Sequence, residues 1–332
     1  MRAAFYETNG PARDVLRVEE VETPRPLAGE VRVKVVRSGV NPSDVKARAG
    51  LTRKIAFPRV IPHSDGAGEI DAVGPGVSPT RLGERVWLWN GQWKRAFGTC
   101  AEYIVLPESQ AVHLPAHIDY EAGACLGIPA MTAAHAISVA DVWAGSTLLI
   151  PGGAGAVGHY AIQFAKARGA VVITTASSPA KAKLAELAGA DHVIDYKREN
   201  VGERVKDLTD NAGVDAVIEL DLAGNAALIP GVLRPRGSVV IYGTGNPGIG
   251  GGAEAVIPAQ WLLVNAVALK FIFVYELTAD ERTRAVHLIT ESLEQKRLLS
   301  NVGRTLPLSE IAQAHELVEQ GNAQGNVVVS LD

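Results

Sequence analysis

Cysteine is scarce in this chain: among 332 residues only Cys100 and Cys125 occur. Two thiols are too few for a disulfide framework or a four-thiolate zinc site, and such scarcity is typical of a reducing compartment. No apolar run approaches the roughly 20 residues of a membrane span, and the first residues, MRAAFYETNG, have no apolar core of the signal-peptide kind. We therefore expect a cytoplasmic protein with no membrane partner and two small, buried cysteines.

Basic clusters are also missing. The formal net charge is −4 and the pI is near 6.1, and no stripe of lysine and arginine offsets the acidic residues. This balance argues against a nucleic-acid partner. The composition, 47% hydrophobic and 20% charged, is that of an ordinary globular protein, and the length suffices for two domains with cores of their own.

The predicted pattern of secondary structure changes near residue 124. Before it, short alternating strands such as 30–37 and 69–73 are separated by turns rich in proline and glycine, which predicts a β-rich, barrel-like domain. After it, strands alternate with helices, as in a doubly wound parallel sheet of the α/β class. The expected strands of this region are 147–150, 171–175, 192–194, 216–219, 238–242 and 268–273.

Two helices and one strand are expected to close the chain. The helices cover 280–297 and 309–320, the second beginning at Ser309 as its cap and ending before Gly321. The last apolar strand, 326–331, has no neighbour nearby in sequence, so we expect it to return to the first domain. The predicted domains are 1–123, 124–273 and a returning segment 274–332.

A glycine-rich turn follows the expected strand 147–150. The pattern G-x-G-x-x-G stands where this strand turns into a helix that stops at Gly169, which is typical of a dinucleotide cradle. The first glycine permits a tight turn, the second lets the backbone approach a pyrophosphate, and the third lets the helix pack closely on its strand. The cradle residues are Gly153, Ala154, Gly155, Ala156, Val157 and Gly158.

The end of the second strand of this region indicates which dinucleotide is bound. An NAD site carries an acidic residue there for the ribose 2′-hydroxyl, but this stretch, VVITTASSPAK, has none. Ser177 can donate a hydroxyl, and Lys181 adds positive charge from the first turn of a helix that Ser178 caps and Pro179 starts. The pattern favours NADPH, although Lys181 and Lys183 on a solvated helix face would look the same.

Taken together, motifs along nearly the whole chain resemble the zinc-independent quinone oxidoreductases, of zeta-crystallin type, in the medium-chain dehydrogenase/reductase superfamily. The resemblance implies a GroES-like catalytic domain of N- and C-terminal segments and a Rossmann domain between them. The matching motifs are GVNPSD (39–44), SDGAGEIDAVGPGV (64–77), GERVW (83–87), AEYIVLP (101–107), GIPAMTA (127–133), GGAGAVG (152–158) and AHELVEQGNAQGNVVV (314–329).

The resemblance also bears on zinc. Zinc-dependent relatives place Cys, His and Cys ligands where this chain has Asn41, Ser64 and Ile128, so we expect no metal. His63 is one position away from such a ligand; a shift of one residue in extended backbone turns the side chain the opposite way. We expect His63 to be a turn or cleft residue.

Further cofactor residues are implied by the resemblance alone. Asn41 and Thr132 would lie beside the nicotinamide ribose and carboxamide, and Tyr196 would flank the adenosine phosphate. Each has a structural alternative: a turn residue for Asn41, a cap or packing residue for Thr132, and half-buried surface for Tyr196. The remaining cofactor-cleft candidates are Tyr242, Gly243, Phe273 and Asn326.

Candidates for binding the acceptor come from two stretches of the chain. The tyrosine that the family carries after N-x-x-x-x is Lys46 here, which can donate a hydrogen bond to a quinone or enone oxygen or can be a solvated lysine. With Asn41 and Thr132 it is a catalytic candidate. In the aromatic stretch 87–103, Trp87 and Trp89 are expected in the core, and Trp93 and Phe97 are candidates for a stacking wall against a planar acceptor.

The expected activity is metal-free, NADPH-dependent reduction of a small-molecule quinone. Conjugated acceptors suit a site without a Lewis acid, because delocalisation lowers the barrier to hydride transfer. The alternatives are a reductase of α,β-unsaturated aldehydes, ketones or thioesters, and a non-catalytic, crystallin-like NADPH-binding protein. The last strand of the parallel sheet, 268–275, has an unpaired edge, which predicts a homodimer.

Overall fold

The computed structural model describes residues 1–245, 254–321 and 323–332. Within this part the chain divides into two compact units. Unit 1 comprises residues 1–129, 289–296 and 300–332, and unit 2 comprises residues 130–288 and 297–299. The domain boundaries expected at 124 and 274 stay predictions beside this division.

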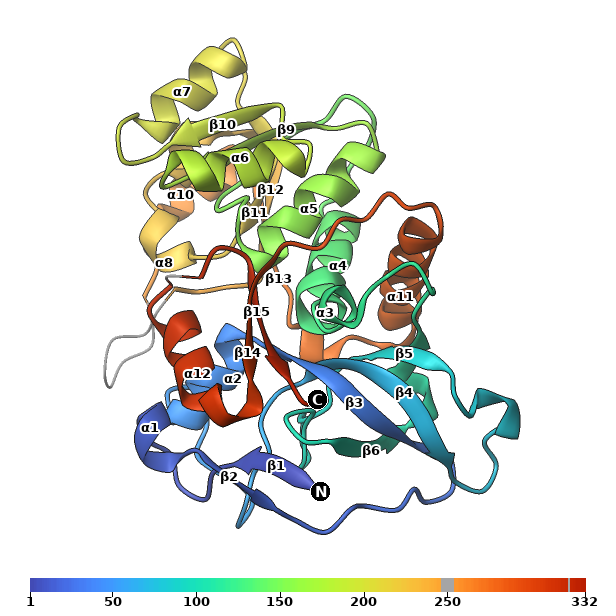
Figure 1. Ribbon diagram of the computed structural model, residues 1–332. Helices are drawn as coiled ribbons and strands as arrows, with labels where there is room; N and C mark the ends of the chain where they lie inside the picture. The colour runs from blue at the N-terminus through green and yellow to red at the C-terminus, as the bar shows by residue number, and fades with distance from the viewer. Residues whose placement is uncertain (246–253, 322) are drawn as a thin grey trace. The chain divides into compact units, whose positions relative to one another are not determined.

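Unit 1 is built on a mainly antiparallel sheet whose strands come from both ends of the chain (Figure 1). Its order is β14-β15-β3-β4-β5-β7, with β6 also paired to β3, and β1 and β2 form a separate antiparallel pair. The strands are β1 (Arg2–Phe5), β2 (Arg17–Glu20), β3 (Glu30–Val40), β4 (Asp65–Val73), β5 (Arg85–Leu88), β6 (Tyr103–Pro107), β7 (Ala111–His113), β14 (Val302–Pro307) and β15 (Asn326–Ser330).

The core of unit 1 follows the alternation of apolar and polar residues along β3. Val31, Val33 and Val35 point to one face and are buried, and Trp87 and both cysteines are buried as well, as expected. Trp89 is also buried. The helices of this unit are α1 (Ala12–Val15), α2 (Pro42–Ala49), α3 (Tyr120–Gly123) and α12 (Ile311–Glu319); a π-helical turn covers Leu126–Ala130, and 3₁₀ turns cover Pro79–Arg81, Glu108–Gln110 and Leu308–Glu310.

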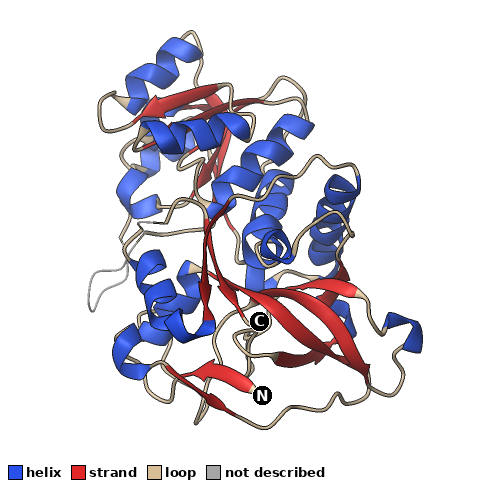
Figure 2. Ribbon diagram, in the orientation of Figure 1, coloured by secondary structure: helices blue, strands red, loops and turns tan. Residues whose placement is uncertain are grey.

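Unit 2 is a doubly wound α/β domain (Figure 2). All six strands are parallel, in the order β10-β9-β8-β11-β12-β13, which is the 3-2-1-4-5-6 order of a Rossmann sheet. The order reverses between β8 and β11, so the ligand crevice of such a fold lies at the carboxyl ends of these strands. The strands are β8 (Thr147–Ile150), β9 (Val171–Ala176), β10 (His192–Asp195), β11 (Val214–Glu219), β12 (Leu233–Ile241) and β13 (Ala268–Phe271).

The six strands predicted for this region are therefore confirmed, with ends that differ by a few residues. Their helices are α4 (Met131–Val139), α5 (Ala156–Ala167), α6 (Pro179–Leu187), α7 (Val201–Leu208), α8 (Leu222–Asn225), α9 (Ile229–Val232), α10 (Ala259–Val264) and the start of α11 (Ala279–Glu294), with a 3₁₀ turn at Val274–Glu276. No helix of the described residues is long and apolar enough to cross a membrane.

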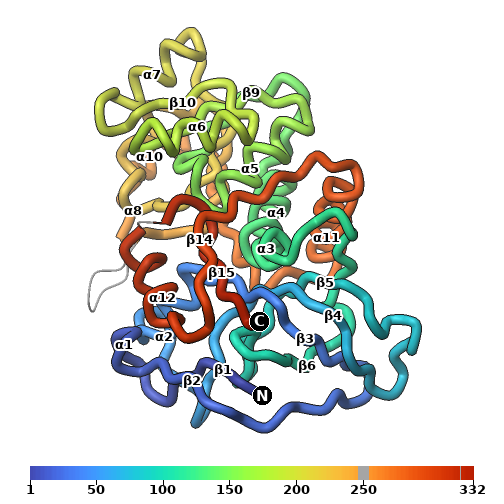
Figure 3. The backbone as a smooth tube through the Cα atoms, in the orientation of Figure 1, coloured from blue at the N-terminus to red at the C-terminus, as the bar shows by residue number. Residues whose placement is uncertain are grey.

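Two details of the C-terminal region differ from expectation. The last helix begins at Ile311 rather than Ser309, because Ser309 lies in a 3₁₀ turn and caps no N–H group. Strand β15 does return to unit 1, where it pairs with β3, but it also has a near neighbour in sequence. This neighbour, β14, was missed because its side chains are mostly exposed and show no clear alternation. Figure 3 follows the backbone of this segment along β14, α12 and β15.

Candidate functional site

The glycine-rich turn of unit 2 stands at the carboxyl end of β8, the central strand. The left-handed residue of the turn is Gly152, with φ of 70°, and Gly155 is the N-cap of α5 and donates its N–H to the Gly152 carbonyl at 2.8 Å. The expected role of Gly153 in the tight turn thus falls to Gly152. Gly153 is required for another reason, because a Cβ there would overlap Thr174 Oγ1.

The other two glycines of the cradle differ from each other. A Cβ on Gly158 would lie 2.5 Å from the Gly152 carbonyl oxygen, so this position holds the helix close to the turn. A Cβ on Gly155 would meet only that same oxygen, at 3.1 Å, and is otherwise in open space. An α-helix leaves its first N–H groups without intrahelical partners, and the backbone at Gly155 is open for a phosphate to approach them. The turn therefore fits a dinucleotide pyrophosphate.

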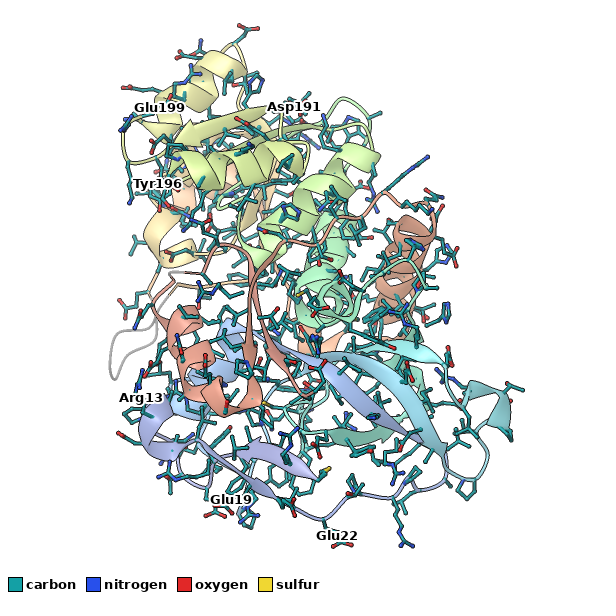
Figure 4. All side chains as sticks on the ribbon, viewed as in Figure 1. Arg13, Glu19, Glu22, Asp191, Tyr196 and Glu199 are labelled. Carbon is teal, nitrogen blue, oxygen red and sulfur yellow. The ribbon has the colours of Figure 1, made fainter. Side chains whose placement is uncertain are left out.

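Neighbouring strand ends bring Ser177, Lys181 and Tyr196 to the same edge of the sheet. Strand β9 ends at Ala176, which is not acidic, and the Tyr196 N–H donates to the Ala176 carbonyl at 3.3 Å. Ser178 caps α6 by accepting from the Lys181 N–H, and Pro179 is its first residue, as predicted. Figure 4 shows Tyr196 and Asp191 at opposite ends of β10.

An acidic residue ends the neighbouring strand, β10. Asp195, the last residue of β10, lies opposite Ala176 in the sheet, but its side chain accepts from the Lys197 N–H at 3.1 Å and lies 3.7 Å from Arg198. Tyr196 is 51% exposed and Lys181 is half-buried. Ser177 and Lys181 follow β9 in the chain, and the backbone of Tyr196 is bonded to its last residue, so a hydroxyl, an ammonium and an aromatic ring belong to residues at this strand end.

The ends of β11 and β12 bring Glu219 and Gly243 together. A Cβ on Gly243 would overlap the Leu220 carbonyl, so only glycine fits there, and Tyr242 donates its N–H to the Glu219 carbonyl at 3.0 Å. Burial raises the pKa of the Glu219 carboxyl, which accepts from Asp221 N and Asn225 Nδ2 at 2.5 and 2.9 Å. Phe273 follows β13 and is 55% exposed.

Thr132 lies in the first turn of α4 and is buried in unit 2. Asn41, its expected companion, is the buried N-cap of α2 in unit 1. The two residues therefore belong to different compact units. Their joint role beside a nicotinamide stays a prediction.

Two buried carboxyl groups fix Asn41. Its Nδ2 donates to Asp65 Oδ2 at 2.7 Å, and its backbone N–H donates to Asp44 Oδ2 at 2.9 Å. The other Asp65 oxygen accepts from the Ile128 N–H at 2.8 Å. Burial raises the pKa of Asp44 to about 7, although hydrogen bonds from the backbones of Asn41 and Ser64 oppose that shift, and burial raises the pKa of Asp65 well above its usual range.

These contacts decide whether a zinc ion fits at Asn41, Ser64 and Ile128. Zinc in proteins is bound by thiolate, imidazole or carboxylate ligands, and these three positions offer an amide, a hydroxyl and an aliphatic side chain. The Asn41 amide already donates to Asp65, and no group of three or more His, Cys, Asp or Glu side chains suited to a metal occurs in the described part of the chain. The residues present do not fit a zinc site.

The C-terminal strand places Asn326 close to Asn41. Strands β15 and β3 are antiparallel and pair Val327 with Val40, so the residues just beyond this pair, Asn326 and Asn41, lie at the same end of the two strands. Asn326 is buried, and its Nδ2 donates to the Asn301 carbonyl at 3.0 Å. Residues 285 positions apart in sequence thus lie at the same end of neighbouring strands in unit 1.

Unit 1 contains a second buried network, centred on two histidines. His63 Nε2 lies 3.0 Å from His315 Nε2, the rings are stacked, and Ser38 Oγ lies 2.8 Å from His63 Nδ1. Both histidines are fully buried, so His63 is a turn residue with φ of 77° rather than a cleft residue. Burial lowers the pKa of His63 to about 3 and that of His315 well below its usual range.

The three acceptor candidates lie in different settings. Trp93 is half-buried and lines a cavity of about 340 Å³, whereas Phe97 is 47% exposed and is outside the described lining of this cavity. Lys46 lies in the last turn of α2, directly before Ala47, which lines the same cavity. Of the three candidates, only Trp93 is among the residues that line this cavity.

Sequence reasoning missed the charged residues of this cavity and the two aspartates that bind Asn41. Arg53, Lys54 and Lys94 line the cavity, but they lie in loops, where no periodicity marks them. Asp44 could have been found, because an asparagine followed three positions later by an acidic residue is the signature of a capped helix start. Asp65 gave no such signal, since its partners are 24 and 63 positions away in sequence.

Comparison with known families agrees with this arrangement. Residues 27–116 match the alcohol dehydrogenase GroES-like domain, and residues 156–291 match the zinc-binding dehydrogenase family. A β-rich unit of this kind joined to a Rossmann unit with a glycine cradle defines a medium-chain dehydrogenase/reductase.

Full-length relatives narrow the class further. Quinone oxidoreductase from Rattus norvegicus is 30% identical over 336 residues, covering 100% of this chain and 98% of the relative, and a 2-haloacrylate reductase from Burkholderia sp is 28% identical, covering 99% and 98%. The chain belongs to the quinone oxidoreductase family of this superfamily, and it is an oxidoreductase.

Solved structures give the same result. A mycobacterial protein in complex with NADPH is 30% identical, with a TM-score of 0.86 over 99% of both chains. Quinone oxidoreductase from Escherichia coli, also in complex with NADPH, is 25% identical, with a TM-score of 0.86 over 99% of this chain and 100% of the other.

Proposed function

We propose that this protein reduces quinones with NADPH and without a metal ion. The observation that carries the proposal is the Asn41–Asp65–Ile128 arrangement, because hydrogen bonds within the protein take the place that metal ligands hold in zinc-dependent relatives. Without a Lewis acid, a site favours acceptors whose conjugation already spreads the developing negative charge. The full-length quinone oxidoreductase relatives support the same conclusion.

The preference for NADPH rests on the end of β9. A carboxylate there would repel a 2′-phosphate, but the residue is Ala176, followed by Ser177, with Lys181 in the first turn of α6. A serine hydroxyl and an ammonium group can bind that phosphate. Tyr196, beside Ala176, supplies an aromatic ring close to the same position. The two neighbouring structures that contain NADPH support this assignment.

Bound NADPH would supply the hydride. The residues of the chain would hold and orient it: the cradle from Gly153 to Gly158 binds the pyrophosphate, and Asn41 and Thr132 bind the nicotinamide end through an amide and a hydroxyl. Asp65 keeps the Asn41 amide in one orientation, because Asn41 Nδ2 donates to it. Lys46 would donate a hydrogen bond to the acceptor oxygen that gains charge, and water would protonate the reduced product.

A reductase of conjugated carbon–carbon double bonds is the second candidate. The 2-haloacrylate reductase from Burkholderia sp, which aligns over nearly the whole chain, favours it. Both candidates need the same cofactor and the same geometry of transfer, so the residues assigned above do not distinguish them.

One experiment separates the candidates. Purified protein is mixed with NADPH or NADH, and the loss of absorbance at the nicotinamide band is followed with quinones, enones, 2-haloacrylates and enoyl thioesters. The proposal requires quinones to give the highest kcat/KM and NADPH to be preferred over NADH. Higher kcat/KM with enoyl compounds would favour the second candidate, and NADPH binding without turnover of any acceptor would indicate a non-catalytic binding protein.

We also propose a homodimer formed through the edge of the parallel sheet. Strand β13 is the last strand of that sheet, so one of its sides has no partner strand in the described chain. Exposed apolar side chains gather in sequence around this edge: Leu263 is 81% exposed, Val264 74% and Phe271 63%. Burying such side chains against a second copy would stabilise a symmetric pair.

A further inference from the structure

The cavity that contains Trp93 has the dimensions of a small-molecule site. Its volume is about 340 Å³, at the lower end of the range of about 300–1,000 Å³ that is usual for ligand pockets. It lies wholly within unit 1, between the start of the chain, helix α2 and two loops. The lining comes from Tyr6, Ala47, residues 53–57, Val60 and residues 92–94.

The charge of this lining has one sign. Arg53, Lys54 and Lys94 are cationic, and none of the described lining residues is acidic. Arg53 also interacts electrostatically with the buried carboxyl of Asp44, which lies outside the lining. Positive charge on a partly buried lining favours an anion, because burial reduces the screening of that charge by water.

Arg53 is positioned as the anchor of this group. One of its terminal nitrogens donates to Gln92 Oε1, and its guanidinium lies 5.3 Å from the centre of the Trp93 ring. A guanidinium has five N–H donors in a fixed plane, so the Gln92 contact orients the group and leaves further donors for a planar, two-oxygen anion. The Lys94 ammonium lies 5.7 Å from the same ring.

The other walls are aromatic and apolar. Tyr6, Phe57 and Trp93 contribute rings, with Ile55 and Val60 between them. Rings favour the burial of a flat conjugated system, and Arg53 and Lys94 lie within 6 Å of the centre of one of these rings, Trp93. The cavity therefore combines a surface for a conjugated ring with an anchor for an anion.

We propose that the cavity selects acceptors whose conjugated carbonyl system bears an anionic oxygen group such as a carboxylate, with Arg53 as its direct partner and Lys54 and Lys94 as the surrounding charge. This inference rests on the proposed reductase function and adds the chemical class of its acceptor. It makes Arg53 a specificity-determining residue.

The kinetic test compares a neutral acceptor with an anionic one of the same skeleton. Initial rates of NADPH oxidation are measured with 1,4-naphthoquinone and with 1,4-naphthoquinone-2-sulfonate for the wild type, Arg53→Gln and Lys94→Gln. The ratio of the two KM values removes effects of the variant on cofactor binding and folding. Arg25→Gln, which replaces an exposed arginine outside the described cavity lining, is the matched control.

Arg53→Gln is expected to raise the ratio of KM for the sulfonate to KM for the neutral quinone about tenfold, the effect of losing one charge-assisted hydrogen bond. Lys94→Gln should raise it less, and the control should leave it unchanged. A ratio that Arg53→Gln does not change overturns the inference, and so does an equal change in the control.

A binding test separates this inference from the reductase proposal. Calorimetric titration with 2-naphthoate and 2-naphthamide needs no turnover. The inference requires the carboxylate to bind at least about tenfold more tightly than the amide, and this preference to be lost in Arg53→Gln. Equal binding of the two compounds overturns the inference. Absence of NADPH oxidation with every quinone, combined with a retained preference for the carboxylate, would refute the proposed function and leave the anion site in place.

Discussion

The side-chain amide of Asn41 donates a hydrogen bond to Asp65 at 2.7 Å inside unit 1. The second oxygen of Asp65 is engaged by the Ile128 backbone, so a single carboxyl group joins two positions that carry zinc ligands in related enzymes. A hydrogen-bonded staple of this kind fixes backbone segments without a metal ion. It also fixes which atoms of the Asn41 amide can face a ligand.

Replacing Asp65 with asparagine should break this staple. Whichever way the new amide turns, its NH₂ group faces either the Asn41 NH₂ or the Ile128 N–H, so one donor opposes another. We expect a loss of roughly 1.5–3 kcal/mol in the free energy of unfolding, measured by urea titration. Asp71→Asn is the control: it makes the same change on the same strand, but at a partly exposed carboxylate paired with Arg32, and should cost less than about 1 kcal/mol.

The double exchange Asn41→Asp with Asp65→Asn tests the geometry further. It restores a donor opposite an acceptor and keeps an acceptor for the Ile128 N–H. Stability should return toward the wild type, whereas NADPH affinity should not, since Asn41 itself is proposed to bind the nicotinamide end. Recovery of both properties would contradict the role given to Asn41.

The glycines of the cradle should respond unequally to alanine. Gly158→Ala places a Cβ 2.5 Å from the Gly152 carbonyl and is expected to lower stability by about 1–3 kcal/mol. Gly155→Ala meets only a 3.1 Å neighbour, so the protein should fold, but the new methyl group would stand where the pyrophosphate approaches. Thermal unfolding and NADPH titration measure the two effects. Gly231→Ala, where no atom lies within 4 Å of the added Cβ, should change neither property.

Binding of the 2′-phosphate of NADPH should depend on Lys181 and not on Lys183, although both lysines lie on α6. Lys181→Gln is expected to raise the KM for NADPH about tenfold and to weaken its dependence on salt, because one charge-assisted contact is lost. Lys183→Gln is the control, since this lysine is exposed and two positions further along the helix, where side chains do not share a face. An equal effect of both variants would indicate that the phosphate responds to the overall positive charge of the helix rather than to a direct contact with Lys181. NADH kinetics should respond to neither.

The buried histidine pair should make stability depend on pH. Burial lowers the pKa of His63 to about 3 from 6.5, and that of His315 also falls, so the folded protein keeps both neutral. In the unfolded chain both histidines take up protons once the pH falls below about 6.5. Their contribution to the free energy of unfolding is therefore complete above this pH and is lost as the pH decreases. Each histidine contributes about 1.4 kcal/mol per pH unit within that window.

Asp44 changes stability in the opposite direction over part of this range. Its folded pKa of about 7 lies above the usual carboxyl value, so the folded state gains a proton as the pH falls from 7, and Asp65 acts in the same sense. The measurement is therefore a difference: the free energy of unfolding of the wild type minus that of His63→Asn/His315→Gln, from pH 8 to 4. Asparagine is chosen at position 63 because it tolerates the left-handed backbone there. A difference that stays constant with pH would contradict buried neutral histidines.

The proposed dimer predicts a mass of twice the 35.0 kDa of one chain in light scattering. Phe271→Asp places a charge on β13 and Leu263→Glu places one on the preceding helix α10, and both variants should yield monomers. Leu187→Glu charges another exposed leucine, on α6, and should leave the mass unchanged. A monomeric wild type would refute the proposal.

Much of unit 2 could be predicted from the sequence because its elements have short-range sequence signals. The apolar run 147–150 before glycines, and the Ser178-Pro179 start of α6, are short-range signals, and the structure confirms them. Strand β14 could not be found in this way, since its exposed side chains form no pattern. It forms a strand because it pairs with β15 in the folded sheet, and its own residues show little preference for a strand.

The candidate site likewise contains residues that local sequence signals reveal and residues that only the folded structure brings together. Glycines of the cradle are visible because a tight backbone turn needs them at fixed spacing. Arg53, Gln92 and Trp93 meet through two loops whose course depends on the whole unit, so their joint cavity has no signature in sequence. The Asp65 staple likewise joins residues that only the folded sheet brings together.

The pairing of β15 with β3 has a consequence for how the chain is made. Residues 130–299, which include the whole parallel-sheet unit, are synthesised before residues 326–330, so residues 37–40 of β3 have no β15 to pair with until after that unit has been made. Newly made chains would therefore acquire a finished nucleotide cradle earlier than the strand that pairs with the end of β3. Chaperones that recognise unpaired strands would meet this protein during that interval.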